Sequence, residues 1–361
     1  IQMQAAPYKN TTDDYLATAG SFALVMIFFC CVIYKYASLT DSEDVKAKMS
    51  DEQRSIFVVP TALVTIVLIL SVLGFALFTE NSLSSQMIVY LVGSVLIVIV
   101  GFLDDLLSLP AKQRFAAQGL VALGTVVLLG YPTQFSLPLL GTLDVGIIGA
   151  IITVIWIVGL INAYNFMDGI DGIAAGNAVI VGLGWLMLFG LTFTPDAHVI
   201  VLALGIVGGC LGFLGHNWSP ARIFMGDVGS TFLGYTFAVL PLLMPSNPDS
   251  PVSPAAALVA AALLLWPFLF DTVLTFTRRL LRGENVFAAH RQHLYQRLVI
   301  AGLPHQLVTS AYMVLALLGI VFAKAYLGGN TIVLLAPLLV GVGLIGVTYL
   351  IAKRQQRTPS L

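Results

Sequence analysis

Long apolar segments alternate with short polar ones along nearly the whole chain. A helix needs about 20 apolar residues to cross the hydrocarbon core of a bilayer. Segments that meet this requirement fall near 20–38, 57–78, 87–103, 116–131, 145–162, 173–191, 197–215, 228–245, 255–276, 307–327 and 331–351. Pro, Gly, Asn and Asp, the usual turn residues, occupy the breaks between them. The pattern predicts an all-α polytopic integral membrane protein with about eleven transmembrane helices.

The composition excludes the main classes of soluble protein. Hydrophobic residues make up 58% of the chain and charged residues only 10%, whereas soluble domains carry roughly 25% charged residues. So few charges could not cover the surface of a soluble protein of 361 residues. The three cysteines lie inside apolar segments without the spacing of metal ligands, and the net charge of −1 gives no sign of a nucleic-acid partner.

Lysine and arginine predict the orientation of the chain, because cytoplasmic loops of membrane proteins carry the excess of positive charge. When the loops are assigned alternately to the two sides, one side collects fifteen of these residues and the other only Lys9 and Lys324. We therefore expect the amino terminus outside and the carboxyl terminus in the cytoplasm. Residues 1–18 would form an extracytoplasmic tail, 19–352 a single transmembrane domain and 353–361 a cytoplasmic tail.

Carboxylates, amides, histidines and arginines gather in the predicted cytoplasmic loops, while the outer loops are short and plain. The residues concerned are Asp104, Asp105, Lys112 and Arg114 in the second inner loop, Asn162, Asn165, Asp168 and Asp171 in the third, Asn217, Phe224 and Asp227 in the fourth, and His290, Arg291 and His293 in the fifth. Hard oxygen donors suit Mg²⁺, and arginine and histidine suit phosphate oxygens. The combination predicts a site for a magnesium-bound phosphate compound on the cytoplasmic face.

Each of these groups also has an ordinary structural explanation. Asp104 and Asp105 could be a solvated helix end, although two carboxylates there face the negative end of the helix dipole and stay ionised more easily beside a cation. Asp227 is well placed to cap the helix that follows it, and the glycines around Asp168 and Asp171 fit a tight turn. The histidine pair could simply be solvated. Together the four clusters are far more specific than any one of them, because each lies at the inner end of a predicted span.

Asp271 is unusual because it lies inside a predicted span, about two turns before Arg278. A carboxylate is costly there and marks either a functional site or a buried partner for arginine. Pro267 predicts a break in the same span, and the break and Asp271 could line a groove for a lipid tail. His198 and His305 have no polar cluster around them in the sequence and are interpreted as structural.

The polar loops contain three longer motifs, which are Gly101-Phe-Leu-Asp-Asp, Ile161-Asn-Ala-Tyr-Asn-Phe-Met-Asp-Gly-Ile-Asp-Gly-Ile-Ala and Asn217-Trp-Ser-Pro-Ala-Arg-Ile-Phe-Met-Gly-Asp-Val-Gly-Ser. Together they resemble one family of membrane enzymes, the polyprenyl-phosphate N-acetylhexosamine-1-phosphate transferases, or glycosyltransferase family 4. The family includes phospho-N-acetylmuramoyl-pentapeptide transferase and the enzymes that start O-antigen synthesis, and the resemblance is closest to the second branch. It covers roughly residues 86–300. It implies ten or eleven helices in the bacterial inner membrane, with the active site facing the cytoplasm.

The resemblance implies the following roles. Asp227 would be the principal Mg²⁺ ligand, with Mn²⁺ as a substitute ion. Asp104 and Asp105 would lie beside the metal, with Asp104 as the base for the lipid phosphate. Phe224 would stack on uracil. The residues that would shape the nucleotide and metal pocket are Asn162, Asn165, Asp168, Asp171 and Asn217. The diphosphate or the sugar would be held by His290, Arg291 and His293, and phosphate would be guided by Lys112 and Arg114.

Two segments depart from the family pattern. In the lipopolysaccharide-type members the first inner loop usually carries a basic Pro-Thr-Pro-Arg-Gly-Gly-like stretch, which residues 40–56 lack. Either the first 80 residues are divergent, or activity rests on other basic groups such as Lys46, Lys48 or Arg54. The histidine segment reads His290-Arg-Gln-His-Leu-Tyr-Gln-Arg rather than the His-rich version of the peptidoglycan enzyme. The second departure favours a simple UDP-N-acetylhexosamine over a muramoyl pentapeptide donor.

The expected reaction is a magnesium-dependent phosphoglycosyl transfer. An N-acetylhexosamine-1-phosphate would move from a UDP-sugar to undecaprenyl or another polyprenyl phosphate, releasing UMP, either in one step or through a covalent aspartyl-phosphate. The alternatives are a phospho-N-acetylmuramoyl-pentapeptide transferase, a glycosyltransferase that releases UDP, an inactive homologue and a membrane transporter. Transporters usually place ionisable groups near the bilayer midplane within repeats, and the sequence shows neither. Whether the protein is a homodimer is left open.

Overall fold

The computed structural model describes residues 84–137, 141–191, 197–244, 252–286, 288 and 290–355. The predicted spans 20–38 and 57–78, the tail 1–18 and the first inner loop 40–56 lie outside these residues, as does most of the predicted tail 353–361. The described helices of the first half are α5 (Ser85–Leu107), α6 (Ala111–Leu129), α7 (Ile148–Phe166), α8 (Ile173–Trp185) with the π-helical turn η2 (Leu186–Gly190), α9 (Ala197–Asn217) and α10 (Gly226–Val239) with the 3₁₀ turn η3 (Leu240–Leu243). Those of the second half are α11 (Pro254–Leu264), α12 (Trp266–Leu281), α13 (Leu294–Ile300), α14 (His305–Leu327), η4 (Thr331–Leu335) and α15 (Ala336–Gln355).

Every span predicted beyond residue 84 corresponds to a helix or a pair of helices. Six described helices are long and apolar enough to cross a membrane, and the bent pair α11–α12 makes up to seven. The protein is therefore a mostly helical, multi-pass membrane protein. The count of eleven spans and the orientation of the termini stay predictions.

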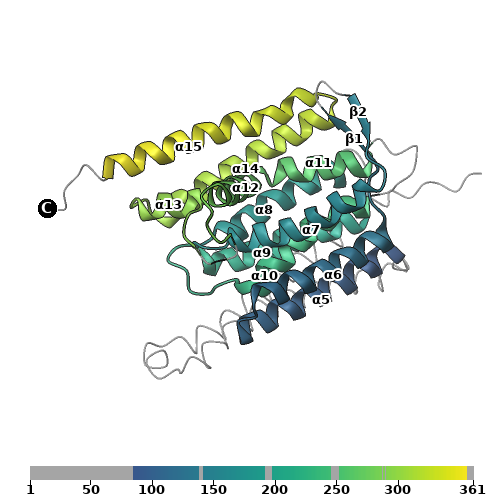
Figure 1. Cartoon of the computed structure of the whole chain (residues 1–361), viewed down its shortest axis with the longest axis horizontal. Coiled ribbons are helices and arrows are strands. Elements are labelled where there is room, and N and C mark those ends of the chain that lie inside the picture. Colours follow the sequence, from purple (N-terminus) through teal and green to yellow (C-terminus); the bar gives the residue numbers. More distant parts are fainter. Residues whose placement is uncertain are drawn as a thin grey trace, which may run out of the picture.

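A β-hairpin replaces the plain outer loop expected between residues 132 and 144. Strands β1 (Gln134–Leu137) and β2 (Gly141–Asp144) pair antiparallel, with Gln134 opposite Asp144 and Leu137 opposite Gly141. The hairpin lies at the end of the helical bundle opposite α13 (Figure 1). The expectation of an all-α chain is therefore wrong at this hairpin. The predicted spans are unaffected, because the strands connect α6 and α7 outside the apolar segments.

Helix α10 packs against α5 and α7. Every residue from Val228 to Val239 is buried. Glycines on the neighbouring helices allow this close packing, because a Cβ on Gly101 of α5 would lie 2.9 Å from the Cα of Val228. Small residues at helix contacts are a usual means of packing helices within a membrane. Contacts with α5 on one side and α7 on the other therefore fix the position of α10, including its amino terminus.

Helices α11 and α12 form one apolar segment that bends by 78° at Leu265. Pro267 lies in the first turn of α12, where a missing N–H costs nothing. The indole nitrogen of Trp266 donates to the carbonyl of Leu315 on α14 at 2.8 Å, which fastens the bend to the neighbouring helix. The predicted break near Pro267 is confirmed.

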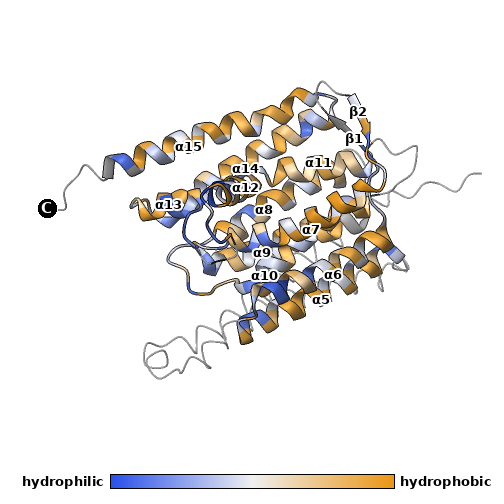
Figure 2. Ribbon diagram, viewed as in Figure 1, coloured by the Kyte–Doolittle hydropathy of each residue, from blue (hydrophilic) through white to orange (hydrophobic). Residues whose placement is uncertain are grey.

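Hydrophilic residues concentrate at the end of the bundle opposite the hairpin, while the helices themselves are largely hydrophobic (Figure 2). The loops between α5 and α6, α7 and α8, α9 and α10, and α12 and α13 lie at this end (Figure 1). These are the loops that the sequence predicts on one membrane face. Their convergence positions the site described next.

Candidate active site

Asp105, near the carboxyl end of α5, caps the amino terminus of α10. Its Oδ1 accepts a hydrogen bond from the backbone N–H of Asp227 at 3.0 Å, and its Oδ2 accepts one from Val228 at 3.2 Å. The first N–H groups of a helix have no partner within the helix, and a carboxylate also complements the positive end of the helix dipole. A helix distant in the sequence thus supplies the cap of α10.

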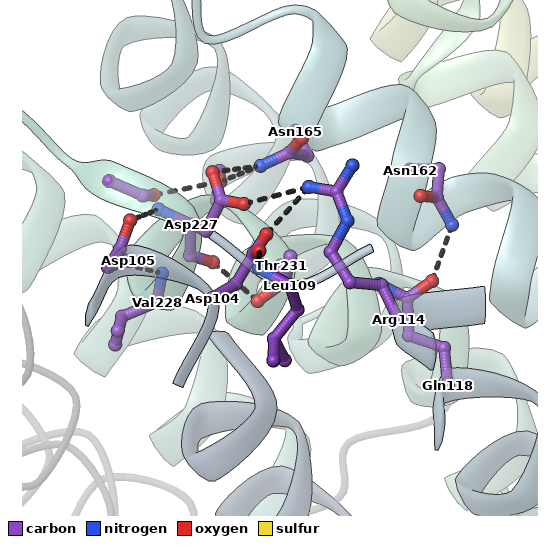
Figure 3. A network of polar contacts seen from close by, with 12 residues as sticks. Asp104, Asp105, Leu109, Arg114, Gln118, Asn162, Asn165, Asp227, Val228 and Thr231 are labelled. Atoms are coloured by element: carbon purple, nitrogen blue, oxygen red, sulfur yellow. Dashed lines mark hydrogen bonds and ion pairs between the residues drawn. The ribbon is translucent and has the colours of Figure 1, made fainter. Parts of the chain in front are cut away.

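Asp104, one residue earlier, faces a different set of partners (Figure 3). Its side chain is buried, and Oδ1 accepts from the backbone N–H of Leu109 at 2.8 Å. Its Oδ2 lies 2.6 Å from Nη1 of Arg114, and the same nitrogen lies 3.3 Å from Oδ2 of Asp227. One guanidinium nitrogen therefore bridges two carboxylates that come from α5 and α10.

The side chain of Asp227 points away from its own helix. Its Oδ1 accepts from Nδ2 of Asn165 at 2.8 Å, and the same amide nitrogen donates to the Ser230 hydroxyl at 3.0 Å. The residue at the N-cap position of α10 is Met225, without a side-chain capping bond. The interpretation of Asp227 as an ordinary N-cap is therefore wrong, because Asp105 caps the helix and leaves Asp227 available to the site.

Asn162 lies one turn before Asn165 on α7 and faces α6. Its Nδ2 donates to Oε1 of Gln118 at 2.6 Å and to the carbonyl of Val158 at 2.8 Å. Both Asn162 and Gln118 line a small cavity of ≈ 10 Å³ together with the side chains of Asp104, Arg114, Asn165 and Asp227. We call Asp104, Asp105, Asn165 and Asp227 the acidic cluster.

The acidic cluster fits a divalent cation that a phosphate ligand helps to hold. Its small cavity has about the volume of one water-sized sphere. The oxygens of Asp104 and Asp227 already converge on a single cationic atom, the Arg114 nitrogen. Among the described residues no group of three or more His, Cys, Asp or Glu side chains could hold a metal. Two carboxylates are what Mg²⁺ usually takes from a protein when substrate phosphates and water complete its shell.

A larger cavity of ≈ 440 Å³ opens beside the acidic cluster. Asn165 and Asp227 line both cavities. The other polar or aromatic residues that line the larger cavity are Asp168, Asp171, Asn217, Phe224 and His305. Phe224 lines this cavity and is 63% exposed. The volume and the mixed lining suit a ligand with an aromatic base and polar groups.

Asn217 and Asp171 hold the wall of this cavity together. The amide of Asn217 accepts from the backbone N–H of Gly172 at 2.9 Å and donates to the carbonyl of Ile223 at 2.8 Å, so it joins two loops. Oδ2 of Asp171 accepts from the backbone N–H of Ala221 at 3.2 Å and lies 3.3 Å from Nδ1 of His305. Sequence reasoning interpreted His305 as structural, and the structure places it in the cavity.

Asp168 lies in the turn after α7, and burial raises its pKa well above the usual range of a carboxyl group. The nearby charges of Asp227 and Asp105 raise this pKa further. A cluster of like charges disfavours ionisation of each member. A cation bound among them would lower the pKa of Asp168 again.

The segment His290–His293, which we call the histidine loop, lies against the same turn. The rings of His290 and His293 stack with centroids 5.0 Å apart, and the ring of His293 lies 6.3 Å from that of Phe166. His290 Nδ1 accepts from the backbone N–H of Gln292 at 3.3 Å, so a neutral ring carries its hydrogen on Nε2. Burial lowers the pKa of His290 to about 4, helped by the neighbouring His293 and Arg279. His290 is therefore a neutral donor at physiological pH.

Two predicted residues lie apart from these contacts. Lys112 and Arg291 are both exposed. Lys112 lies two positions from Arg114 on α6, and side chains two positions apart on a helix do not face the same way. Of the basic pair in the second inner loop, only Arg114 reaches the acidic cluster.

Residues 87–244, which carry the acidic cluster and most of the large cavity, match the model of glycosyl transferase family 4. A Bacillus subtilis protein described as a probable undecaprenyl-phosphate N-acetylglucosaminyl 1-phosphate transferase is 35% identical over 70% of this chain and 67% of its own length. The chain belongs to glycosyl transferase family 4.

Two further relatives show the range of this family. The decaprenyl-phosphate N-acetylglucosaminephosphotransferase of Mycobacterium leprae is 30% identical over 62% of this chain, which spans 61% of the relative's length. The phospho-N-acetylmuramoyl-pentapeptide-transferase of Symbiobacterium thermophilum is 36% identical over 65% of this chain and 75% of its own length. These relatives are phosphosugar transferases whose names specify a lipid phosphate or a phospho-sugar.

Sequence reasoning missed several polar residues around the two cavities: Gln118 and Thr231 line the small cavity, Ser230 accepts a hydrogen bond from Asn165, and His305 lines the large cavity. Gln118, Ser230 and Thr231 are ordinary polar residues in helices, and nothing in their spacing distinguishes them. His305 could have been found from its position at the first residue of a helix that begins after the histidine loop. The signal was weak because its partner, Asp171, lies far away in the sequence.

Proposed function

We propose that this chain transfers an N-acetylhexosamine-1-phosphate from a UDP-sugar to undecaprenyl or another polyprenyl phosphate. The products are a polyprenyl-diphospho-sugar and UMP. The observation that carries the proposal is the convergence of Asp104, Arg114 and Asp227 beside a cavity of ≈ 440 Å³ that bears an exposed aromatic ring. The membership in glycosyl transferase family 4 and the names of the relatives support it.

The chemistry explains why these residue types are needed. A lipid phosphate must approach the β-phosphate of the donor, so two anions meet and their repulsion must be offset. A Mg²⁺ ion held by Asp227 and Asp104 would supply positive charge for the phosphate oxygens. Arg114 lies within reach of both carboxylates and would bind the oxygens of one phosphate from the same side.

The other residues bind and orient the donor. Phe224 stacks on uracil, and Asp171 and His305 line the same end of the cavity. The Nε2–H of His290 is suited to donate to a diphosphate or sugar oxygen. The lipid phosphate is largely ionised near neutral pH, so Asp104 contributes modestly as a base for the remaining proton.

The proposed setting is the bacterial inner membrane, with the acidic cluster facing the cytoplasm. There the reaction would be the first membrane step of O-antigen or related cell-envelope polysaccharide synthesis. A phospho-N-acetylmuramoyl-pentapeptide transferase is the second candidate, because several relatives carry that name. The sequence of the histidine segment supports the first candidate, since it reads His290-Arg-Gln-His-Leu-Tyr-Gln-Arg rather than the His-rich version of the peptidoglycan enzyme.

The test is nucleotide release from the purified protein in detergent. The protein is incubated with undecaprenyl phosphate, Mg²⁺ and either UDP-N-acetylglucosamine or UDP-N-acetylmuramoyl pentapeptide. Asp227→Asn is the matched control, because it keeps the shape of the side chain and removes its charge. We expect UMP from the first donor only when lipid and Mg²⁺ are both present, and none from the control.

Other outcomes separate the alternatives. Release of UDP would replace phosphosugar transfer by glycosyl transfer. UMP from the pentapeptide donor alone would establish the second candidate. If none of several UDP-N-acetylhexosamines or the pentapeptide donor releases nucleotide, the chain is an inactive homologue and the proposal fails.

A further inference from the structure

A second carboxylate site lies apart from the acidic cluster, around Asp271. This residue is in α12, shortly after the 78° bend, and its side chain is 0% exposed. A carboxylate in a membrane-embedded helix is costly unless its oxygens are fully hydrogen-bonded. The sequence left two interpretations open, a functional site or a buried partner for arginine. In the structure no arginine is paired with Asp271 among the described residues.

The Oδ1 atom of Asp271 accepts three hydrogen bonds. They come from the backbone N–H of Leu294 at 2.8 Å, from the Thr275 hydroxyl at 3.2 Å and from Nδ1 of His293 at 3.2 Å. Because a carboxylate oxygen accepts, Nδ1 carries the hydrogen, and a neutral His293 has an unprotonated Nε2. A carboxylate bound to one ring nitrogen fixes both the tautomer and the orientation of an imidazole.

The Oδ2 atom connects two further elements. It accepts from the backbone N–H of Tyr295 at 3.2 Å and from the Tyr312 hydroxyl at 2.7 Å. Leu294 and Tyr295 begin α13, and Tyr312 belongs to α14. One carboxylate thus joins α12, α13 and α14 at the point where the histidine loop ends.

The network continues from Asp271 to the acidic cluster. The hydroxyl of Tyr295 donates to the carbonyl of Phe166 at 2.9 Å, and Phe166 lies between Asn165 and Asp168 in the sequence. The side chains of His293 and Tyr295 are almost completely buried. Gly169 leaves the space that this contact needs, because a Cβ there would collide with the Tyr295 hydroxyl. A displacement at Asp271 therefore reaches both the histidine loop and the turn that carries Asp168.

We propose that Asp271 is a positioning residue, which holds His293 and the start of α13 in the orientation that phosphosugar transfer requires. The inference rests on the proposed function and adds to it a residue that does not touch the substrates. It replaces the interpretation of Asp271 as part of a lipid groove, because both of its oxygens face protein donors. A residue of this kind should affect turnover more than donor binding, since the site is assembled but misaligned.

The experiment compares Asp271→Asn, His293→Gln and the double variant with the wild-type protein, all in detergent. UMP release by the wild type is measured first. If the wild type releases no UMP, the proposed function fails, and this result is distinct from any effect of the variants. We expect Asp271→Asn to lower kcat by roughly 10- to 100-fold, the usual effect of removing a partner that orients a histidine. The donor KM should change by less than about threefold.

The double variant separates positioning from plain stabilisation. If Asp271 acts through His293, the double variant should be no slower than the slower single variant, because residues that act as a unit are not additive. Tyr312→Phe is the control for stability, since it removes one hydrogen bond to Asp271 and leaves His293 in place. We expect it to lower the melting temperature while kcat stays within about twofold. Multiplicative losses in the double variant, or a normal kcat in Asp271→Asn, would overturn the proposal.

A further variant covers the case in which Asp271→Asn does not fold. Tyr295→Phe keeps the ring and removes only the hydroxyl that reaches Phe166. The proposal expects a lower kcat for Tyr295→Phe than for Tyr312→Phe, although each loses one buried hydroxyl. Equal kcat values for these two variants would show that the connection from α13 to the Asp168 turn has no part in the reaction.

Discussion

The molecule holds two carboxylate sites of opposite character within one polar end. In the acidic cluster, Asp104 and Asp227 share a single guanidinium nitrogen, and Asp227 also lines the large cavity. Around Asp271, one fully buried carboxylate accepts five hydrogen bonds, two of them from backbone N–H groups. The first site has negative charge in excess and is suited to bind a cation and its ligands. The second is already satisfied and is suited to hold other residues in place. Burial and the number of donors, rather than residue type, distinguish the two tasks.

The largest expected effect is that of Asp104→Asn, and it distinguishes Asp104 from its neighbour Asp105. Asp104→Asn should lower UMP release roughly a thousand-fold, the upper range for removing one electrostatic group from an active site. Asp105→Asn should instead lower the melting temperature, because the cap of α10 is worth about 1–2 kcal/mol. Activity assays and thermal unfolding in detergent measure the two effects. Equal losses of stability in both variants would contradict the division of tasks described above.

A second prediction concerns the contact that joins the two sites. Gly169→Ala introduces a Cβ that collides with the Tyr295 hydroxyl, so the turn bearing Asp168 must shift. We expect kcat to fall by some tens of fold, since small misplacements in an active site cost up to about a hundred-fold. Adding Tyr295→Phe removes the colliding oxygen and should restore part of the stability lost in Gly169→Ala. A double variant with the same melting temperature as Gly169→Ala would show that the collision is relieved elsewhere.

A third prediction addresses the open side of the large cavity. Phe224→Ala should raise the donor KM about tenfold, because stacking of a base on an aromatic ring is worth about 1–3 kcal/mol. The melting temperature should stay unchanged, since the ring is 63% exposed. Phe224→Trp is the control and should keep the wild-type KM. A KM for Phe224→Ala that equals the wild-type value would exclude stacking as the task of this ring.

The smallest effect is expected for His290, and it concerns pH. Its pKa is lowered to about 4 from a usual value of 6.5, so it is neutral at pH 5.5–8. The unfolded chain binds a proton at His290 below about pH 6.5 and the folded chain does not, so folding stability is lost as the pH falls from 6.5 toward 4. His290→Gln should lower kcat by a few fold, because it removes the Nε2–H donor. The pH profile of kcat over pH 5.5–8 should keep its wild-type shape, because His290 stays neutral over that range. A shifted acid limb in this variant would mean that His290 titrates in that range.

The arrangement of helices could largely be predicted from the sequence, because membrane-spanning helices must satisfy their backbone internally and be long enough to cross the bilayer. The polar loops could be assigned to one membrane face because successive spans place their loops alternately on the two sides, and lysine and arginine mark one side. The separate tasks of Asp104 and Asp105 could not, because they depend on where the backbone of α10 lies. Asp271 and His293 were each singled out from the sequence, but their pairing was not, because the two residues lie 22 positions apart and the other donors are backbone N–H groups and ordinary hydroxyls. The β1–β2 hairpin was missed because its strands have only four residues each.

The five hydrogen-bond donors of Asp271 all come after it in the chain. Residues 293–295 come more than twenty positions later and Tyr312 about forty positions later. A growing chain that has inserted α12 thus has one of the five donors, Thr275, until residues 293–295 and then Tyr312 have been made. A chain that ends between residues 282 and 292 would keep only one of these five donors, the Thr275 hydroxyl, and a poorly satisfied carboxylate in a membrane-embedded helix is costly. The carboxylate of Asp271 therefore ties the stability of α12 to completion of α13 and α14.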